Sequence, residues 1–442
     1  MKQRVAGTMQ CCGPLEAVAR RLSTRNFLLA VLTLAAALLG PENAGAQATV
    51  IRAGHLIDPA TGKVTDNQSI VVQDGKIAFV GTEVSVTPNT QVIDLSKSWV
   101  LPGLMDAHTH LTLGLSREQG LEESYLKASS GWRLLQGLRN AKGMLEAGFT
   151  TVRDVGNAAN YADTDVRLAI EKGWFAGPTV VNTGKIIAPL GGQFPGISPD
   201  WPGFWHYEYI DADTPEEIRK GIRQNIYYGA KAIKLVADSY PYHYSVEDIR
   251  AAVDETHRAG MKLAVHVYGG EAARDVILGG ADSIEHGFAL DDDTLKLMKE
   301  KGTWLVGTDF PYEHLKAIGG LLNEDPKTTA DKIIDRLRRA NKIGVKMAFG
   351  SDVVSDLEGK DRGQMTMDYV DVWTAAGVPP ADILKAMTTN AAELLGIAGE
   401  RGAVKAGQAA DLIATPENPL ENIQALRKVN FVMKDGAVIK RP

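Results

Sequence analysis

The chain has 442 residues, of which 44% are hydrophobic and 23% charged, and its formal net charge is −6. These values are ordinary for a soluble globular protein with one large and one smaller domain. The acidic balance gives no reason to expect nucleic acid or an anionic membrane surface as a partner.

The N-terminus has the features of a leader peptide. Three arginines precede an apolar run at 27–39, which is short for a membrane span, and Ala44-Gly45-Ala46 follows it. We predict a signal peptide over 1–46 and an exported protein, periplasmic or secreted, that is free of the membrane after cleavage. An uncleaved anchor is the alternative. Cys11 and Cys12 are the only cysteines, so the mature chain would offer a metal only nitrogen and oxygen ligands.

Both ends of the remaining chain are rich in β-type runs. Near the start they lie at 49–53, 69–72, 76–80 and 91–95, with Asp74-Gly75 as a hairpin signal. Near the end they lie at 411–414, 429–433 and 437–439. We expect an antiparallel sheet from the first set. We also expect 47–100 and 399–442 to combine into one small β-sandwich domain.

Strands and helices alternate through the middle of the chain, 101–398. The first expected strand ends at His108, and the others lie at 150–154, 178–182, 232–236, 262–266, 282–286, 303–307 and 345–352. Helical patterns occupy 214–227, 245–259, 271–278, 293–301, 328–342 and 380–395, the last with an interior Thr-Thr-Asn that can divide it. This α/β alternation implies a parallel sheet. Eight units favour a closed (β/α)8 TIM-like barrel over a doubly wound sheet.

Ionisable side chains recur where these strands end. They are His108, His110, Lys234, His266, His286 and Asp352. Active sites of such barrels lie at the carboxyl ends of the strands. Each residue alone could be structural, but a lysine inside Ala-Ile-Lys-Leu-Val is costly to bury unpaired. Together the six predict one site.

The pattern resembles the metal-dependent amidohydrolase superfamily. More narrowly, the stretches at 147–156, 283–287, 389–396 and 407–412 are similar to the branch that contains imidazolonepropionase-like enzymes, Xaa-Pro and Xaa-Arg dipeptidases and ochratoxin-hydrolysing amidohydrolases. The resemblance covers essentially the whole chain after the leader.

The resemblance implies a binuclear site with two divalent ions, zinc first and manganese or cobalt as alternatives. His108, His110 and Asp352 would bind one ion and His266 and His286 the other, while a carbamate on Lys234 would bridge them. Hydroxide generated at the metals would attack the amide carbonyl. Asp352 would act as general base and then acid.

Loops after the third and fourth strands would shape the substrate pocket. Tyr240, Tyr242, His243 and Tyr244 are candidates for the oxyanion donor, although they could instead form an aromatic packing loop. Gln193 stands where many relatives carry a substrate-contacting histidine. Trp205 and Tyr244 could wall an aromatic-accepting pocket, or could pack within their own loops. Arg153 could bind a substrate carboxylate, or could be structural.

We therefore expect a small-molecule substrate with a linear amide: a hydrophobic or aromatic dipeptide or N-acyl amino acid, with ochratoxin-like amides included. A hydrolase of cyclic amides, imidazolones or lactones is the alternative. A non-catalytic scaffold and an exported binding protein are the other classes, and the complete ligand set argues against the scaffold. We also expect a homo-oligomer.

Overall fold

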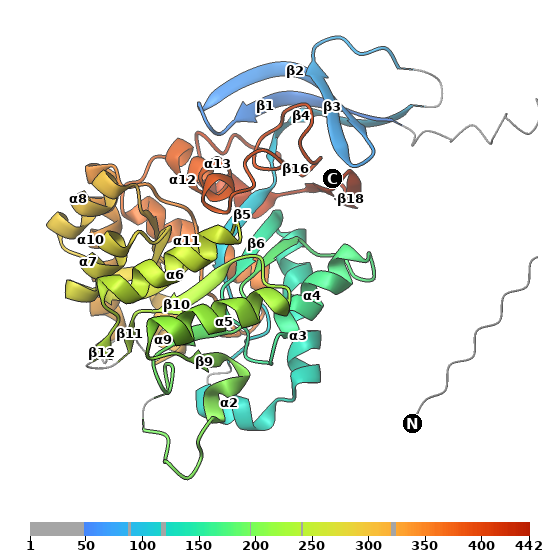
Figure 1. The fold of residues 1–442 in the computed structure, drawn as a ribbon. Helices are drawn as coiled ribbons and strands as arrows, with labels where there is room; N and C mark the ends of the chain where they lie inside the picture. The colour runs from blue at the N-terminus through green and yellow to red at the C-terminus, as the bar shows by residue number, and fades with distance from the viewer. Residues whose placement is uncertain (1–47, 87–89, 116–120, 195, 240–241, 320–323) are drawn as a thin grey trace, which may run out of the picture. The chain divides into compact units, whose positions relative to one another are not determined.

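The computed structural model describes residues 48–86, 90–115, 121–194, 196–239, 242–319 and 324–442 (Figure 1). The predicted leader and Tyr240 lie outside these ranges. Residues 48–442 belong to one compact unit, which is described by itself below.

A seven-stranded sheet combines both ends of the described chain, in the order β18-β17-β16-β4-β1-β2-β3. Its strands are β1 (Thr49–Asp58), β2 (Lys63–Gln73), β3 (Lys76–Gly81), β4 (Gln91–Pro102), β16 (Leu412–Thr415), β17 (Phe431–Lys434) and β18 (Ala437–Lys440). The two ends meet where β4 pairs with β16. The expectation of a purely antiparallel sheet was wrong, because β1 and β4 are parallel neighbours.

The turn between β2 and β3 follows from its sequence. Asp74 and Gly75 both have positive φ, 51° and 76°, as a two-residue hairpin requires, and Gln73 pairs with Lys76 across it. Alternate apolar side chains of this sheet, among them Ile51, Ile70 and Ile93, form a core of their own.

Most strands in the middle of the chain are parallel and form two sheets. One sheet has the order β5-β6-β7 and another the order β15-β14-β13-β10-β8-β9. Their strands are β5 (Leu104–Thr109), β6 (Phe149–Asp154), β7 (Thr179–Asn182), β8 (Ile186–Ala188), β9 (Tyr209–Asp211), β10 (Ile233–Val236), β13 (Leu263–Gly269), β14 (Ser283–Ala289) and β15 (Trp304–Val306). A short hairpin of β11 (Asp238–Ser239) and β12 (Tyr242–His243) follows β10.

Backbone hydrogen bonds connect the edges of these two sheets. The amides of Lys231 and Ala232 both donate to the carbonyl of Asn182, which joins β10 to β7. On the other side, segment 346–352 lies between β15 and β5: Ala348 N donates to Leu305 O, and Ala107 N donates to Phe349 O. This segment was expected to be the eighth strand. It makes a single isolated bridge, at Met347, rather than a regular ladder.

Helices separate most of the parallel strands, so the fold is mixed α/β. They are α2 (Leu121–Lys127), α3 (Ser130–Glu146), α4 (Ala162–Glu171), α5 (Pro215–Tyr227), α6 (Val246–Arg258), α7 (Gly270–Gly279), α8 (Asp292–Lys301), α9 (Tyr312–Ala317), α10 (Pro326–Ile343), α11 (Arg362–Ala375), α12 (Pro380–Ala386) and α13 (Thr389–Leu394), with 3₁₀ turns η1 (Phe204–Tyr207) and η2 (Ile423–Lys428). In the part of the chain with described coordinates, no helix combines the length and apolarity needed to cross a membrane.

The sequence predicts best the helices with strong caps. Thr214 caps α5 by accepting from Glu217 N, and Ser245 with Asp248 forms a capping box on α6. The predicted helix at 380–395 divides into α12 and α13. Helix α11 was not predicted, because most of its residues are buried and its sequence lacks a clear amphipathic stripe, although Gln364, Asp371 and Thr374 are exposed.

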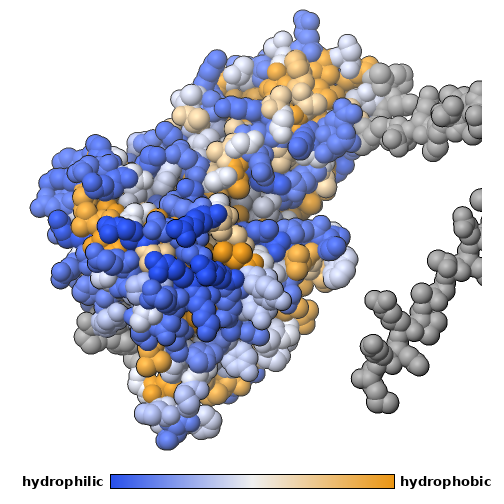
Figure 2. Space-filling model, in the orientation of Figure 1, coloured by the Kyte–Doolittle hydropathy of each residue, from blue (hydrophilic) through white to orange (hydrophobic). Residues whose placement is uncertain are grey.

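The outer surface is polar over α5 and α6 (Figure 2). Hydrophobic residues gather over the sheet near β3 and again toward α2 in the same view (Figure 2), where Phe79 and Leu126 are exposed. The continuous apolar core lies between the parallel strands and their helices, and holds the ends of those strands in fixed positions.

Candidate metal centre

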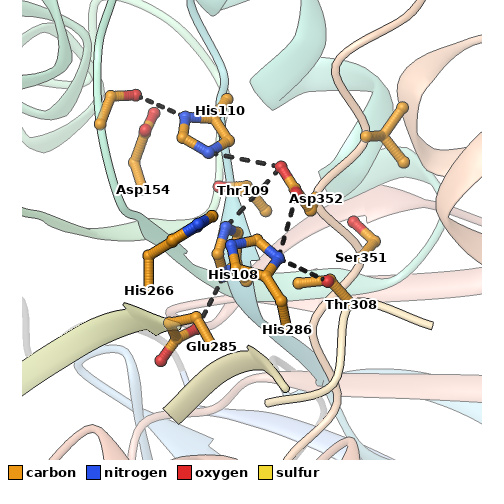
Figure 3. A network of polar contacts seen from close by, with 12 residues as sticks. His108, Thr109, His110, Asp154, His266, Glu285, His286, Thr308, Ser351 and Asp352 are labelled. Atoms are coloured by element: carbon orange, nitrogen blue, oxygen red, sulfur yellow. Dashed lines mark hydrogen bonds and ion pairs between the residues drawn. The ribbon is translucent and has the colours of Figure 1, made fainter. Parts of the chain in front are cut away.

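The histidines predicted from the strand ends lie together in the structure (Figure 3). His108 lies on β5 and His110 directly follows the end of that strand, two residues on, so the two share a face. His266 lies on β13 and His286 on β14. The His108 and His286 rings are 5.0 Å apart between centroids, and the His266 and His286 rings 4.3 Å. Four imidazoles from three strands therefore face one small space.

Asp352 completes this cluster from the end of segment 346–352. Its Oδ1 lies 3.3 Å from His110 Nε2 and 3.7 Å from His108 Nε2, and its Oδ2 lies 3.6 Å from His286 Nδ1. His108, His286 and Asp352 each place a possible ligand atom within 4.8 Å of the others. A backbone bond from Asp352 N to His108 O, 2.8 Å long, fixes the carboxylate beside β5.

Two members of the cluster have an unusual backbone. His286 and Asp352 have φ values of 70° and 57°, in the left-handed region that residues other than glycine seldom adopt. Such conformations cost about 1–3 kcal/mol each and gather at functional sites. Both residues belong to the cluster, where His286 Nδ1 lies 3.6 Å from Asp352 Oδ2.

Lys234 lies at the same centre, from β10. Its side chain is buried, and its charge contributes to lowering the pKa of all four histidines. Burial lowers the pKa of Lys234 itself, against the nearby carboxylates of Glu285 and Asp352. All six side chains predicted from the strand ends are thus brought together.

Three of the histidine rings are held by a contact to the Nδ1 atom. His108 Nδ1 donates to Glu285 Oε2 at 2.6 Å, and His110 Nδ1 donates to the carbonyl of Gly156 at 2.9 Å. His286 Nδ1 lies 2.8 Å from Thr308 Oγ1. Such partners orient metal-binding imidazoles and fix their tautomers. The Nε2 atoms of His108 and His110 are left to face Asp352.

This arrangement fits a divalent metal ion. His108 Nε2 is a buried nitrogen with no hydrogen-bond partner among the described residues. Burial, followed by neighbouring charges, holds the pKa of His108, His266 and His286 well below the usual range and that of His110 at about 4. The rings are therefore neutral at pH 7, and neutral imidazoles with carboxylates are the N/O donors that zinc accepts.

Two acidic residues that support the site were not predicted. Glu285 is fully buried and also receives Arg153 Nη2 at 2.7 Å. Asp106 Oδ1 accepts from the backbone of His108 and Ser351, and burial raises the pKa of Asp106 to about 7. A charged residue inside an apolar strand, the signal that singled out Lys234, would have found Glu285 as well.

The structure corrects the role expected for Arg153. The side chain is fully buried, and its nitrogens donate to Ala107 O, Ser283 Oγ and Glu285 Oε1. Arg153 therefore cannot bind a substrate carboxylate. It is a structural residue that supports Glu285 and, through it, His108.

The aromatic loop residues also differ from expectation. Tyr244 is fully buried and its hydroxyl donates to the carbonyl of Ala212, so it cannot contact a substrate or stabilise an oxyanion. Trp205 is buried against Phe194 and donates through Nε1 to Asp211 Oδ1 at 2.7 Å. For both residues the alternative of packing within the loops was correct.

Of the other loop candidates, Gln193 reaches the cluster. Its Nε2 lies 3.2 Å from His266 Nε2, and its Oε1 accepts from the hydroxyl of Tyr209 at 2.9 Å. Tyr242 is exposed on the β11–β12 hairpin, and His243 Nε2 lies 3.7 Å from Asp275. The choice among Tyr240, Tyr242 and His243 as oxyanion donor stays a prediction.

Comparison with known proteins defines the class of this protein. The model of the amidohydrolase family matches residues 99–439. The chain therefore belongs to the amidohydrolase family and is a hydrolase of amide bonds. Members of this family are generally metal-dependent, in agreement with the possible metal site at His108, His286 and Asp352.

Individual relatives within this family are similar to the chain over most of its length. An ochratoxinase of Aspergillus niger is 31% identical over 446 residues, which cover 90% of this chain and 88% of the relative. An imidazolonepropionase of Shewanella pealeana is 26% identical, covering 80% and 89%. Among solved structures, a Xaa-Pro dipeptidase with methionine in its active site is 30% identical, with a TM-score of 0.80, covering 89% of this chain and all of that one.

Proposed function

We propose that this protein is a binuclear metal-dependent amidohydrolase that hydrolyses a linear amide bond in a dipeptide or N-acyl amino acid with a hydrophobic or aromatic leaving residue. The observation that carries the proposal is the convergence of four neutral histidines, Lys234 and Asp352 on one space. A site made only to stabilise the fold would not leave His108 Nε2 buried and unpartnered within the described residues.

The donor set suits two divalent ions, with zinc favoured by the imidazole-rich set. His108, His110 and Asp352 would hold one ion, and His266 and His286 the other. Bound ions of this kind lower the pKa of water and polarise a carbonyl. Burial lowers the pKa of Lys234, which favours the neutral amine that combines with carbon dioxide. A carbamate on Lys234 would then supply anionic oxygens to both ions.

The chain's own groups supply the proton transfer. Asp352 lies within 3.3–3.7 Å of three histidines, and burial raises the pKa of its carboxyl. A carboxylate with a raised pKa is suited to accept a proton from water and deliver it to the leaving nitrogen. Glu285 holds His108 in one tautomer throughout. Gln193 lies beside His266, where it could contact substrate.

We also propose that the parallel strands close into a (β/α)8 barrel over 101–398. The support is the set of backbone bonds that joins β7 to β10 on one side and places segment 346–352 between β15 and β5 on the other. Segments 47–100 and 399–442 would form the accompanying β domain, which their shared seven-stranded sheet supports. Export after removal of residues 1–46, and assembly into a homo-oligomer, are parts of the same proposal.

The named relatives support a linear amide. They include an ochratoxinase, a Xaa-Pro dipeptidase and a prolidase crystallised with N-methylphosphonate-L-proline, the last 27% identical with a TM-score of 0.77. The imidazolonepropionase relative favours a cyclic amide as the second candidate.

The test is hydrolysis by the mature protein after metal removal and reloading with zinc, manganese or cobalt. Dipeptides, N-acyl aromatic amino acids and ring amides are offered together, and release of amino acid is measured. We expect linear amides to be cleaved, with about two ions bound per chain. Lys234→Ala and Asp352→Asn should lose activity. Cleavage of ring amides alone would select the second candidate, and no metal-dependent cleavage would reject both.

A further inference from the structure

Glu208 is a buried carboxyl that the proposed reaction does not use. It lies between η1 and β9, in the part of the chain that follows β8. Its carbonyl accepts from Ile186 N at 2.8 Å, so its backbone is fixed at the start of the β8–β9 pair. Its exposed fraction is only 4%.

The Glu208 side chain has no partner among the described residues. No hydrogen bond or ion pair reaches its carboxylate from that part of the chain, whereas the neighbouring acid Asp211 accepts from both Trp205 and His206. Buried carboxylates are almost always paired, because an unpaired one is costly. The Glu208 carboxyl therefore has no cation or hydrogen-bond donor within the described chain, and a bound molecule could supply one.

The position of Glu208 relates it to the metal centre. Burial, and then the charge of Asp352, raise the pKa of Glu208 to about 8, and no cationic side chain opposes them. The next residue, Tyr209, donates to Gln193, which in turn lies beside His266. Glu208 is thus close enough to the cluster to feel the charge of Asp352, and it is adjacent in sequence to Tyr209, from which contacts run through Gln193 to His266.

We propose that Glu208 binds the free α-ammonium group of a dipeptide substrate, an inference that rests on the proposed amide hydrolysis. The α-nitrogen of a peptide is about 2.5 Å from the carbonyl carbon of its own residue, by standard covalent geometry. A scissile carbonyl held beside Asp352 therefore brings the ammonium into the same region. The ammonium supplies the cation that Glu208 lacks, and Glu208 selects dipeptides over N-acyl amino acids.

The test compares three substrates that release the same residue, phenylalanine. Ala-Phe carries the α-ammonium, N-acetyl-Ala-Phe lacks any cation, and N-acetyl-Lys-Phe carries a cation only on its side chain. The metal-loaded wild-type enzyme is compared with Glu208→Gln, with Glu208→Met and with Glu300→Gln. The last is the matched control, because Glu300 is an exposed carboxylate on α8. Bound metal and Tm are measured for every variant.

We expect Glu208→Gln and Glu208→Met to lower kcat/KM for Ala-Phe by about 10- to 100-fold, the range for a lost hydrogen bond to a charged group. Activity on N-acetyl-Ala-Phe, bound metal and Tm should stay unchanged, since the Glu208 side chain makes no hydrogen bond or ion pair with the described residues that the substitutions could break. Glu300→Gln should match the wild type on all three substrates.

Other results overturn the inference. An equal loss on Ala-Phe and N-acetyl-Ala-Phe would make Glu208 a general structural residue, and a loss of bound metal would assign it to the metal centre. A loss confined to N-acetyl-Lys-Phe would assign it to a side-chain cation. If the wild type cleaves N-acetyl-Ala-Phe but not Ala-Phe, this inference fails while the proposed function stands. If no linear amide is cleaved, the proposed function itself fails.

Discussion

The contact between Glu285 and His108 gives the sharpest test of how this site is held. Glu285 accepts from three donors: His108 Nδ1 at 2.6 Å, Arg153 Nη2 at 2.7 Å and Ser283 Oγ at 2.5 Å. In Glu285→Gln only one oxygen remains to accept. If that oxygen stays with Arg153, the new amide N–H groups face His108 Nδ1. His108 must then carry its proton on Nε2, which removes the lone pair directed at the metal.

Two magnitudes follow from this geometry. Arg153 and Glu285 are both fully buried, and removing one partner of a buried pair costs about 3–5 kcal/mol. We therefore expect the metal-free variant to lose about that much unfolding free energy. Loss of a residue that orients a metal ligand weakens metal binding about 10- to 100-fold. Urea unfolding of the metal-free protein and competition with a chelator measure the two effects.

Glu255→Gln is the matched control. Glu255 also pairs with an arginine, Arg223, at 2.6 Å, but the arginine side chain is 66% exposed. Exposed ion pairs of this kind contribute about 0–1 kcal/mol to the free energy of unfolding. This pair also lies away from the histidines. If Glu285→Gln loses no more stability than Glu255→Gln, or binds metal as tightly as the wild type, the argument from burial and tautomer is refuted.

Two further predictions concern Thr308, which follows β15, and Asp163, which lies on α4. Thr308 has a φ of 44°, which is rare for a β-branched residue, and its hydroxyl contacts His286 Nδ1. Thr308→Ser keeps this hydroxyl and should keep activity, whereas Thr308→Val removes it and should lower kcat/KM about 10-fold or more. Equal activity of the two variants would contradict this role. Burial raises the pKa of Asp163 from 3.8 to about 6. Because the folded protein holds this proton more tightly, the contribution of Asp163 to the free energy of unfolding is full below about pH 4 and is lost as the pH rises through about 6. The change is about 3 kcal/mol. Urea unfolding of the metal-free protein at pH 4 and pH 7 should therefore show a smaller decline for Asp163→Asn than for the wild type, and parallel declines would reject the assignment.

Local signals in the chain predicted much of the fold. Period-two runs and the Asp74-Gly75 turn indicated the β-rich start, and capping residues such as Thr214 and Ser245 indicated where helices begin. These signals act within a few residues, so they can be read without the rest of the molecule. The parallel pairing of β1 with β4 could not be read this way, because it is set by partners about 40 residues apart. Helix α11 carries no amphipathic stripe to read.

The candidate site divides in the same manner. By itself the sequence determined which residue types stand at the strand ends, because side-chain alternation and the position of each strand end are local properties. Only the tertiary structure decided that Arg153 supports Glu285 beneath His108, that Trp205 and Tyr244 pack inward, and that Glu208 is buried without a partner in the described chain. These outcomes depend on which donors and acceptors lie opposite, and those come from segments distant in sequence. The order of residues names the ligands, whereas the packing around them decides which charges are paired and which remain for a substrate.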